Sequence, residues 1–237
     1  MSTPVEKILY LVKEKLNKLD SQDFDNLPDV KIISAYNEGR INWLRKNLSG
    51  LNVLKAGDES TKKRLDDFNE ILTLPTDLTV AKKDGYYLSQ KLFSDYFEFK
   101  RIEFDAKSKC CEKPLKMMCF LVGESNADLY LRDEFKQPNF NWGHTFCTLE
   151  DFRLKIYTND EFDIENVKLT YYRFPKNVEK VGVLNLDTQA YSTSNFDCEF
   201  KTDLGILFIK EAASLIAGPL EMYNQSQLND NQNEKTN

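Results

Sequence analysis

Histidine, glycine and paired cysteines are scarce in this chain. His144 is the only histidine, nine glycines are spread over 237 residues, and the five cysteines form no CxxC pair. This count excludes a histidine-rich metal site, and no cysteine pair has the spacing of a zinc finger. No GxxxxGK[ST] or GxGxxG motif is present to cradle a phosphate. From these absences we expect a protein without catalysis, metal or cofactor.

Long apolar runs and an excess of positive charge are also lacking. The longest apolar runs are far too short for a membrane-spanning helix, so no membrane association is expected. The formal net charge is −6, and Lys and Arg are interspersed with Asp and Glu. Binding to nucleic-acid phosphates requires stripes of Lys and Arg, so this composition disfavours it.

Aromatic residues, by contrast, are plentiful, with 16 Phe, 11 Tyr and 2 Trp. Such rings supply large buried areas in sheets and at protein interfaces. A chain of this length forms one large domain or two small ones, and it can bury a core without a disulfide or a metal.

Helical periodicity marks the N-terminal part of the chain. Thr3 is the expected N-cap of a first helix, Glu6 completes a capping box, and the helix should run to about Leu19. A second helix is expected from near Pro28 to a stop at Gly50. Its apolar stripe, which one polar residue interrupts, consists of Val30, Ile33, Asn37, Ile41 and Leu44.

Helical periodicity returns near the C-terminus. Thr202 is a good N-cap, and an apolar-striped helix is expected to follow it to about Tyr223. The remaining residues, QSQLNDNQNEKTN, are polar and predict a flexible tail.

Between the helices, strand-like segments alternate with turn signals. A slip in the alternation at Lys100 and Arg101 predicts a bulge. Residues 128–142 are expected to form a short helical turn and an extended loop. The segments predicted as strands are Ile71, Tyr86–Leu88, Tyr96–Phe104, Leu115–Val122, Phe152–Tyr157 and Val167–Tyr172.

These elements predict an α+β fold. An N-terminal helical hairpin and a C-terminal helix enclose an antiparallel β-sandwich or barrel-like region. The expected parts are a helical part at 1–69, a β-rich insertion at 70–185, a helix completing the helical part at 186–223, and a flexible tail at 224–237.

Three groups of residues are candidates for chemistry. A Cys147–His144 pair could act as nucleophile and base, but the alternative is a histidine in a loop beside a strand. The carboxylates of Asp160–Asp163 could bind Ca²⁺ or Mg²⁺, but they lack the EF-hand pattern, and a polar hairpin turn is the alternative. The neighbouring Cys110 and Cys111 could be redox-active or incidental.

The sequence resembles virion structural proteins of tailed bacteriophages at two segments, KLTYYRFP (168–175) and DCEFKTDLGILFIKEAASLIAGPLEMYNQSQ (197–227). In particular, it is similar to ring proteins of the portal–tail neck of crAss-like phages. The two N-terminal helices and PNFNWGHTF (138–146) add to the resemblance, which covers most of the chain.

The resemblance implies a structural subunit of the virion. It predicts a homo-oligomeric ring, expected to be dodecameric, that is assembled in the bacterial host cytoplasm and serves as an adaptor between the portal and the tail. The implied partners are further copies of the chain, the portal protein and neighbouring tail or neck ring proteins, with DNA passing through the lumen without specific binding. Trp43, Trp142, Tyr223 and Gln225 are the candidate interface residues, although the core is the other position open to Trp43.

Two other functions remain alternatives to a ring subunit. An aromatic-rich β-sandwich could bind a carbohydrate or another ligand, which requires exposed Tyr or Trp rings in one concave patch. A small hydrolase could use Cys147 or a carboxylate pair.

Overall fold

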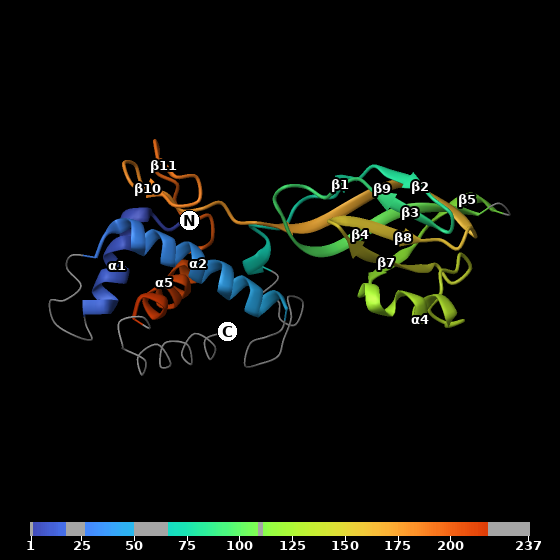
Figure 1. The fold of residues 1–237 in the computed structure, drawn as a ribbon, viewed down its shortest axis with the longest axis horizontal. Helices are drawn as coiled ribbons and strands as arrows, with labels where there is room; N and C mark the ends of the chain where they lie inside the picture. The colour runs from blue at the N-terminus through green and yellow to red at the C-terminus, as the bar shows by residue number, and fades with distance from the viewer. Residues whose placement is uncertain (1, 18–26, 50–65, 109–110, 218–237) are drawn as a thin grey trace. The chain divides into compact units, whose positions relative to one another are not determined.

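The predicted α+β fold class is confirmed, with helices near both ends of the chain around a region of strands. The structure, a computed structural model, describes residues 2–17, 27–49, 66–108 and 111–217. The chain divides into two compact units, Met1–Glu70 with Pro175–Asn237 and Ile71–Phe174 (Figure 1). We call the first the helical unit and the second the β unit. The β unit ends at Phe174, earlier than the predicted end of the β-rich insertion at 185.

The helical unit is organised around its C-terminal helix. Its helices are α1 (Val5–Asn17), α2 (Asp29–Leu48) and α5 (Thr202–Ala217). Helix α5 packs against both α1 and α2, which touch each other far less, because α5 is apolar on more than one side. The predicted extensions of α1 to Leu19 and of α5 to Tyr223 lie outside the described residues. None of the helices that the structure describes is both long and apolar enough to cross a bilayer.

The start of α1 differs from the prediction. The backbone N–H of Val5 donates to Oδ1 of Asp197 at 3.0 Å, so Thr3 is not the cap. Thr3 instead forms an antiparallel bridge with Cys198, in which each backbone N–H donates to the other residue's carbonyl oxygen, at 3.3 and 3.1 Å. A carboxylate at the first turn of a helix is electrostatically favourable. The cap therefore comes from a residue far along the chain.

Trp43 lies in the core of the helical unit, which confirms one of its two predicted positions and corrects the other, a subunit contact. Its side chain is only 3% exposed. Its ring centroid is 5.4 Å from that of Phe208 on α5 and 5.9 Å from that of Phe68. Tyr36 and Phe200 also contact the Phe208 ring edge-on. Another subunit could reach Trp43 only if this cluster opened.

The buried face of α2 is rotated relative to the predicted stripe. Gly39 makes this possible, because a Cβ there would lie 3.1 Å from the backbone N of Ala212 and 3.1 Å from Cγ of Glu211 on α5. The two helices therefore approach closely at this point. The buried residues of α2 are Ile32, Ile33, Tyr36, Gly39, Arg40, Trp43, Leu44 and Asn47.

Arg40 is a charged residue on that buried face. Its Nη1 donates to the carbonyl oxygen of Lys176 at 2.7 Å, and its Nη2 donates to Oδ1 of Asn37 at 3.2 Å. Burial lowers the pKa of Arg40 below its ordinary value, although nearby polar groups oppose this effect. Arginine nevertheless stays protonated in proteins, so the charge is held by these hydrogen bonds.

The β unit consists of two sheets in a sandwich-like arrangement, without a closed barrel. One sheet has the order β1 (Thr76–Asp77), β9 (Phe162–Arg173), β4 (Tyr96–Ser108), β5 (Cys111–Lys116). The other has the order β2 (Val80–Lys82), β3 (Tyr86–Ser89), β8 (Arg153–Tyr157), β7 (His144–Glu150), β6 (Met118–Leu121).

The long β4–β9 pair supplies much of the β-unit core. Both strands alternate, and their inward side chains pack against residues of the facing sheet such as Leu154 and Ile156. The predicted bulge at Lys100 and Arg101 is confirmed, because the register shifts between Phe99 and Arg101. The buried side chains from β4 and β9 are Ile102, Phe104, Ala106, Phe162, Ile164, Val167, Leu169 and Tyr171.

The single strand predicted at Leu115–Val122 was wrong, and one strand was missed. The segment is not one strand, because the chain passes at the buried Met117 from β5 in one sheet to β6 in the other. Strand β7 was not predicted, and β6 pairs with it in parallel rather than antiparallel. A parallel pair requires a crossover. The crossover contains the short helices η1 (Glu124–Asn126) and α4 (Ala127–Arg132), the latter in the expected helical turn.

Replacing Gly205 by alanine should destabilise the helical unit. The added Cβ would lie 2.3 Å from Oγ1 of Thr3, which is held by its bridge to Cys198. We expect the free energy of unfolding to fall by roughly 1–3 kcal/mol. The measurement is urea unfolding followed by Trp43 fluorescence in a Trp142→Phe background.

Gly123→Ala is the matched control for this clash. Gly123 has a φ of −63°, and the nearest atom to an added Cβ is 3.9 Å away. Adding Thr3→Ala to Gly205→Ala should restore part of the lost stability. A double variant no more stable than Gly205→Ala alone would contradict the steric explanation.

Candidate interaction surfaces

The structure does not bring Cys147 and His144 together as a catalytic pair. They are three residues apart on β7, and side chains at odd spacing on a strand point to opposite faces of the sheet. Cys147 is fully buried in the core between the sheets, where it contacts Cys119. Burial, with Cys147 beside it, raises the pKa of the Cys119 thiol well above its ordinary value. A thiol with a raised pKa stays protonated and is a poor nucleophile, which applies to Cys119.

The acidic segment Asp160–Asp163 forms a hairpin turn. Asn159 and Asp160 adopt left-handed conformations, with φ of 48° and 57°, as a tight turn between β8 and β9 requires. Asp163 accepts hydrogen bonds from Nζ of Lys82 and, at 2.8 Å, from the hydroxyl of Tyr87. In the part of the chain that the structure describes, no three His, Cys, Asp or Glu side chains gather as a metal site. Cys110 lies outside this part, as does the side chain of Cys111.

A groove of about 450 Å³ follows the outer side of α2 in the helical unit. Its other wall is the segment that leads into the hairpin of β10 (Leu184–Asn185) and β11 (Ala190–Tyr191). The predicted apolar stripe of α2 faces this groove. The residues of that stripe in the lining are Val30, Ile33, Asn37 and Ile41.

Asn37 interrupts the stripe because its amide holds the hairpin segment to α2. Its Nδ2 donates to the carbonyl oxygen of Val178 at 3.1 Å, and its Oδ1 accepts from the backbone N–H of Val178 at 2.9 Å. At the start of α2, Asp29 accepts hydrogen bonds from Lys180 at 2.8 Å and Lys13 at 3.3 Å. Burial opposes ionisation of Asp29, but the two lysines outweigh it and lower its pKa.

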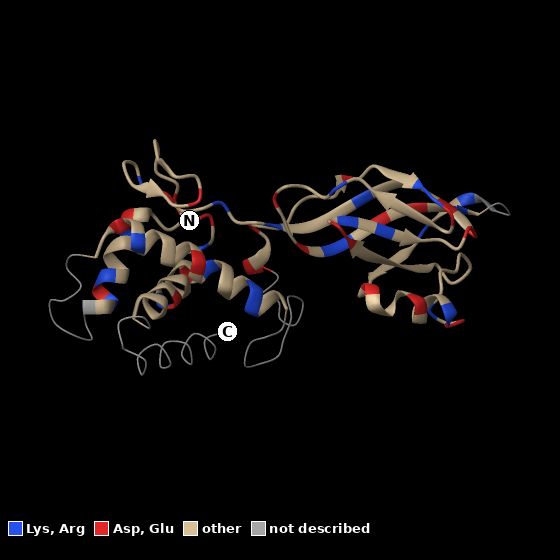
Figure 2. Cartoon of the chain, in the orientation of Figure 1, with Lys and Arg blue, Asp and Glu red and all other residues tan. Residues whose placement is uncertain are grey.

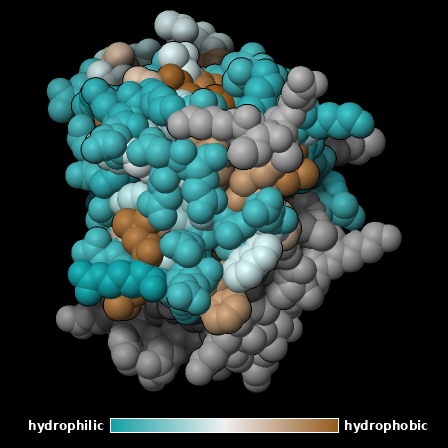
Figure 3. All heavy atoms as spheres, turned by 90° about the vertical axis from the view of Figure 1, so that its right-hand side faces the viewer, coloured by the Kyte–Doolittle hydropathy of each residue, from teal (hydrophilic) through white to brown (hydrophobic). Residues whose placement is uncertain are grey.

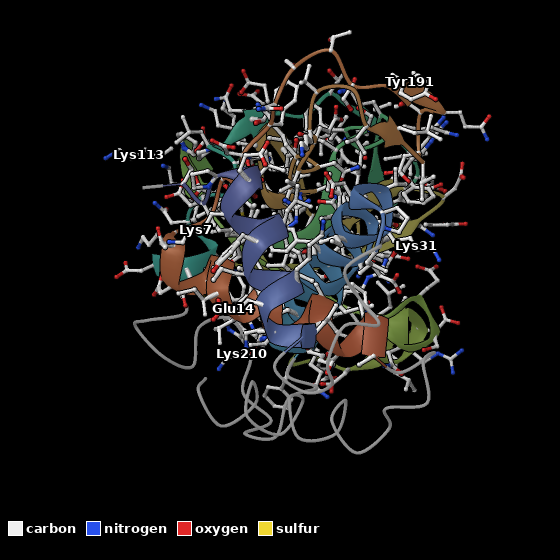
Figure 4. All side chains as sticks on the ribbon, turned by 90° about the vertical axis from the view of Figure 1, so that its left-hand side faces the viewer. Lys7, Glu14, Lys31, Lys113, Tyr191 and Lys210 are labelled. Carbon is white, nitrogen blue, oxygen red and sulfur yellow. The ribbon has the colours of Figure 1, made fainter. Side chains whose placement is uncertain are left out.

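The hairpin carries apolar side chains on its outside. Tyr191 is 71% exposed, and Figure 4 shows its side chain at the outer edge of the hairpin, away from α2. Val181, Leu186 and Phe196 are also exposed. This surface rests on a segment that is fastened to α2 mainly through side chains.

The β unit carries a second apolar surface, around the edge strand β6. The exposed fractions are 63% for Met118, 54% for Phe120 and 73% for Phe135. We call it the β6 edge surface and define it by Leu115, Met118, Phe120, Leu121, Phe135 and Trp142. Figure 3 shows the end of the β unit, where hydrophobic patches interrupt a mostly hydrophilic surface.

The backbone of β6 also leaves polar groups without a strand to pair with. The backbone N–H of Met118 donates to the carbonyl oxygen of Gly143, just before β7, and that of Val122 donates to the carbonyl oxygen of Cys147 on β7, both at 2.9 Å. In a parallel pair, alternate residues direct their N–H and C=O to the partner strand. Cys119 and Leu121 therefore direct theirs away from β7, and β6 is the last strand of the sheet.

The other sheet edges carry features that discourage pairing. Strand β5 contains Pro114 and two lysines, β2 ends at Lys82 and is followed by Lys83, and β1 has only two residues. Proline, lysine and shortness are common protections of edge strands. The sequence of β6, MCFL, contains neither proline nor lysine. Among the edges of the two large sheets, β6 is therefore the one most suited to a partner.

Trp142 is exposed, and its role as an interface residue stays a prediction. Its side chain is 52% exposed, and its ring stacks on Phe135 with centroids 5.7 Å apart. The ring of His144 lies 5.8 Å from it on a tilted plane. The Trp142 ring is therefore already in contact with two neighbouring rings. The other two candidate interface residues, Tyr223 and Gln225, lie outside the described residues.

Charge does not single out either surface. Figure 2 shows Lys and Arg mixed with Asp and Glu over both units, without a stripe of one sign. Many of these side chains are paired, as Lys107 is with Glu165 at 2.6 Å. Such exposed pairs contribute little to stability.

Comparisons with known proteins identify no family for this chain. No protein-family model matches the chain, and no curated protein matches it at a significant level.

Replacing Asn37 by leucine should release the hairpin segment from α2. The variant removes both hydrogen bonds to Val178, and the loss of buried partners should lower the free energy of unfolding by about 1–3 kcal/mol. Hydrogen exchange at the Val178 amide should accelerate. Asn42→Leu is the matched control, because Asn42 lines the same groove. Equal exchange at Val178 in the two variants would contradict the proposed anchor.

Proposed function

We propose that the protein is a structural subunit of a bacteriophage virion, without catalytic activity. It forms an oligomeric ring, expected to be dodecameric, in the portal–tail connector of a crAss-like phage. The ring acts as an adaptor between the portal and the tail, and DNA passes through its lumen. This placement follows from the resemblance of the segments at 168–175 and 197–227 to neck ring proteins.

The observation that carries an assembly role is the β6 edge surface. It joins exposed apolar side chains to outward-facing backbone groups of Cys119 and Leu121 on a strand without charge. Native proteins usually cover or charge such an edge, because it pairs readily with another chain. In an assembled ring, a neighbouring subunit would cover the β6 edge in this way. A ring contact requires two different patches on each subunit. The exposed apolar residues on and beside the β10–β11 hairpin of the helical unit offer the second patch: Val181, Leu186, Tyr191 and Phe196.

Ligand binding is the second function considered, and the arrangement of Trp142 disfavours it. A carbohydrate platform presents an aromatic ring face to the sugar. The Trp142 ring already contacts the rings of Phe135 and His144. The exposed rings therefore form a cluster with one another, which fits a protein contact better.

Native mass measurement tests the ring. The protein is measured alone and mixed with the portal protein and the neighbouring neck proteins of the same phage. We expect a species of dodecamer scale in the mixture, because the partner ring supplies the template for closure. A monomer or dimer that ignores these proteins at micromolar concentration would contradict the proposal.

A further inference from the structure

The outward-facing backbone groups of β6 are arranged symmetrically about Phe120. Cys119 and Leu121 point their N–H and C=O groups away from β7, and Phe120 between them points its own toward β7. In an antiparallel pair, two opposite residues can exchange both hydrogen bonds. Two copies of β6 can therefore pair with Cys119 opposite Leu121 and Leu121 opposite Cys119. This register satisfies all four outward groups of each copy.

We infer that the purified protein forms a twofold dimer in which β6 pairs antiparallel with β6 of a second copy, centred on Phe120. The five-stranded sheets of the two copies then continue as one sheet. The inference goes beyond the proposed ring and does not depend on it, because it concerns the chain before any virion partner is present.

The side chains around the centre support this register. Phe120 faces Phe120 of the second copy as a non-hydrogen-bonded pair, in which side chains lie closest. Both rings are more than half exposed in the single chain. Pairing removes them from water, and an aromatic cross-strand pair is among the favourable ones.

A twofold contact cannot be the repeated contact within a ring. A ring of one subunit type uses two different patches, whereas a twofold contact uses the same patch twice. The dimer therefore belongs to the free protein, where it covers the β6 edge surface until a virion partner replaces the second copy.

The first test measures the mass of the purified protein alone by native mass spectrometry and sedimentation at micromolar concentration. A dimer is expected, and Phe120→Asp should convert it to a monomer, because two carboxylates would face each other. Phe152→Asp is the control, since Phe152 is exposed on the β7–β8 turn and should leave the dimer intact. A wild-type monomer would overturn the inference.

Cysteine cross-linking tests the centre directly. Phe120→Cys should form an intermolecular disulfide on oxidation, because the Cα atoms of a non-hydrogen-bonded pair lie about 4.5 Å apart. Met118→Cys, on the same face of the same strand, should not, because Met118 lies opposite Val122 of the second copy. Equal cross-linking of the two variants, or none for Phe120→Cys, would overturn the inference, whatever mass the protein has.

Discussion

The pairing of β4 with β9 is the interaction on which the β unit depends. These two strands are the longest in the described part of the chain, and their inward side chains form much of the core between the sheets. The register shifts along the pair bend the strands around that core. After β5 has paired with β4, the chain passes at Met117 into the other sheet, where β6 can pair only with β7. The position of β6 at an edge is therefore a consequence of how the core is closed.

The sequence predicted much of the fold because its helices and long strands have strong periodicity. It failed where distant residues decide the outcome. The buried face of α2 depends on Gly39 fitting against α5 and on hydrogen bonds from Arg40, and a buried arginine does not belong to an apolar pattern. The N-cap of α1 comes from Asp197 rather than from the local Thr3. In the sequence, Met117 lies in the middle of one predicted strand. In the structure it separates β5 from β6, because the two strands belong to different sheets.

The candidate surfaces were less predictable than the fold. Trp142 was named as an interface residue and is exposed, whereas Trp43, the other tryptophan, fills the core. Composition cannot separate these cases, because burial of a single ring depends on which element covers it. Strand β6 lies within a predicted strand, but the sequence does not state which strand ends a sheet. Its lack of proline and charge is visible in the sequence and acquires meaning only once that position is known.

The most direct test of the virion assignment is the abundance of this chain in purified particles of the phage that encodes it. Quantitative mass spectrometry of washed virions would compare its copies with those of the portal protein. A connector ring of the expected symmetry predicts equal copy numbers for the two, retained when loosely bound host proteins are removed by salt. Absence from the particles, or a small fraction of the portal copy number, would contradict the structural role proposed here.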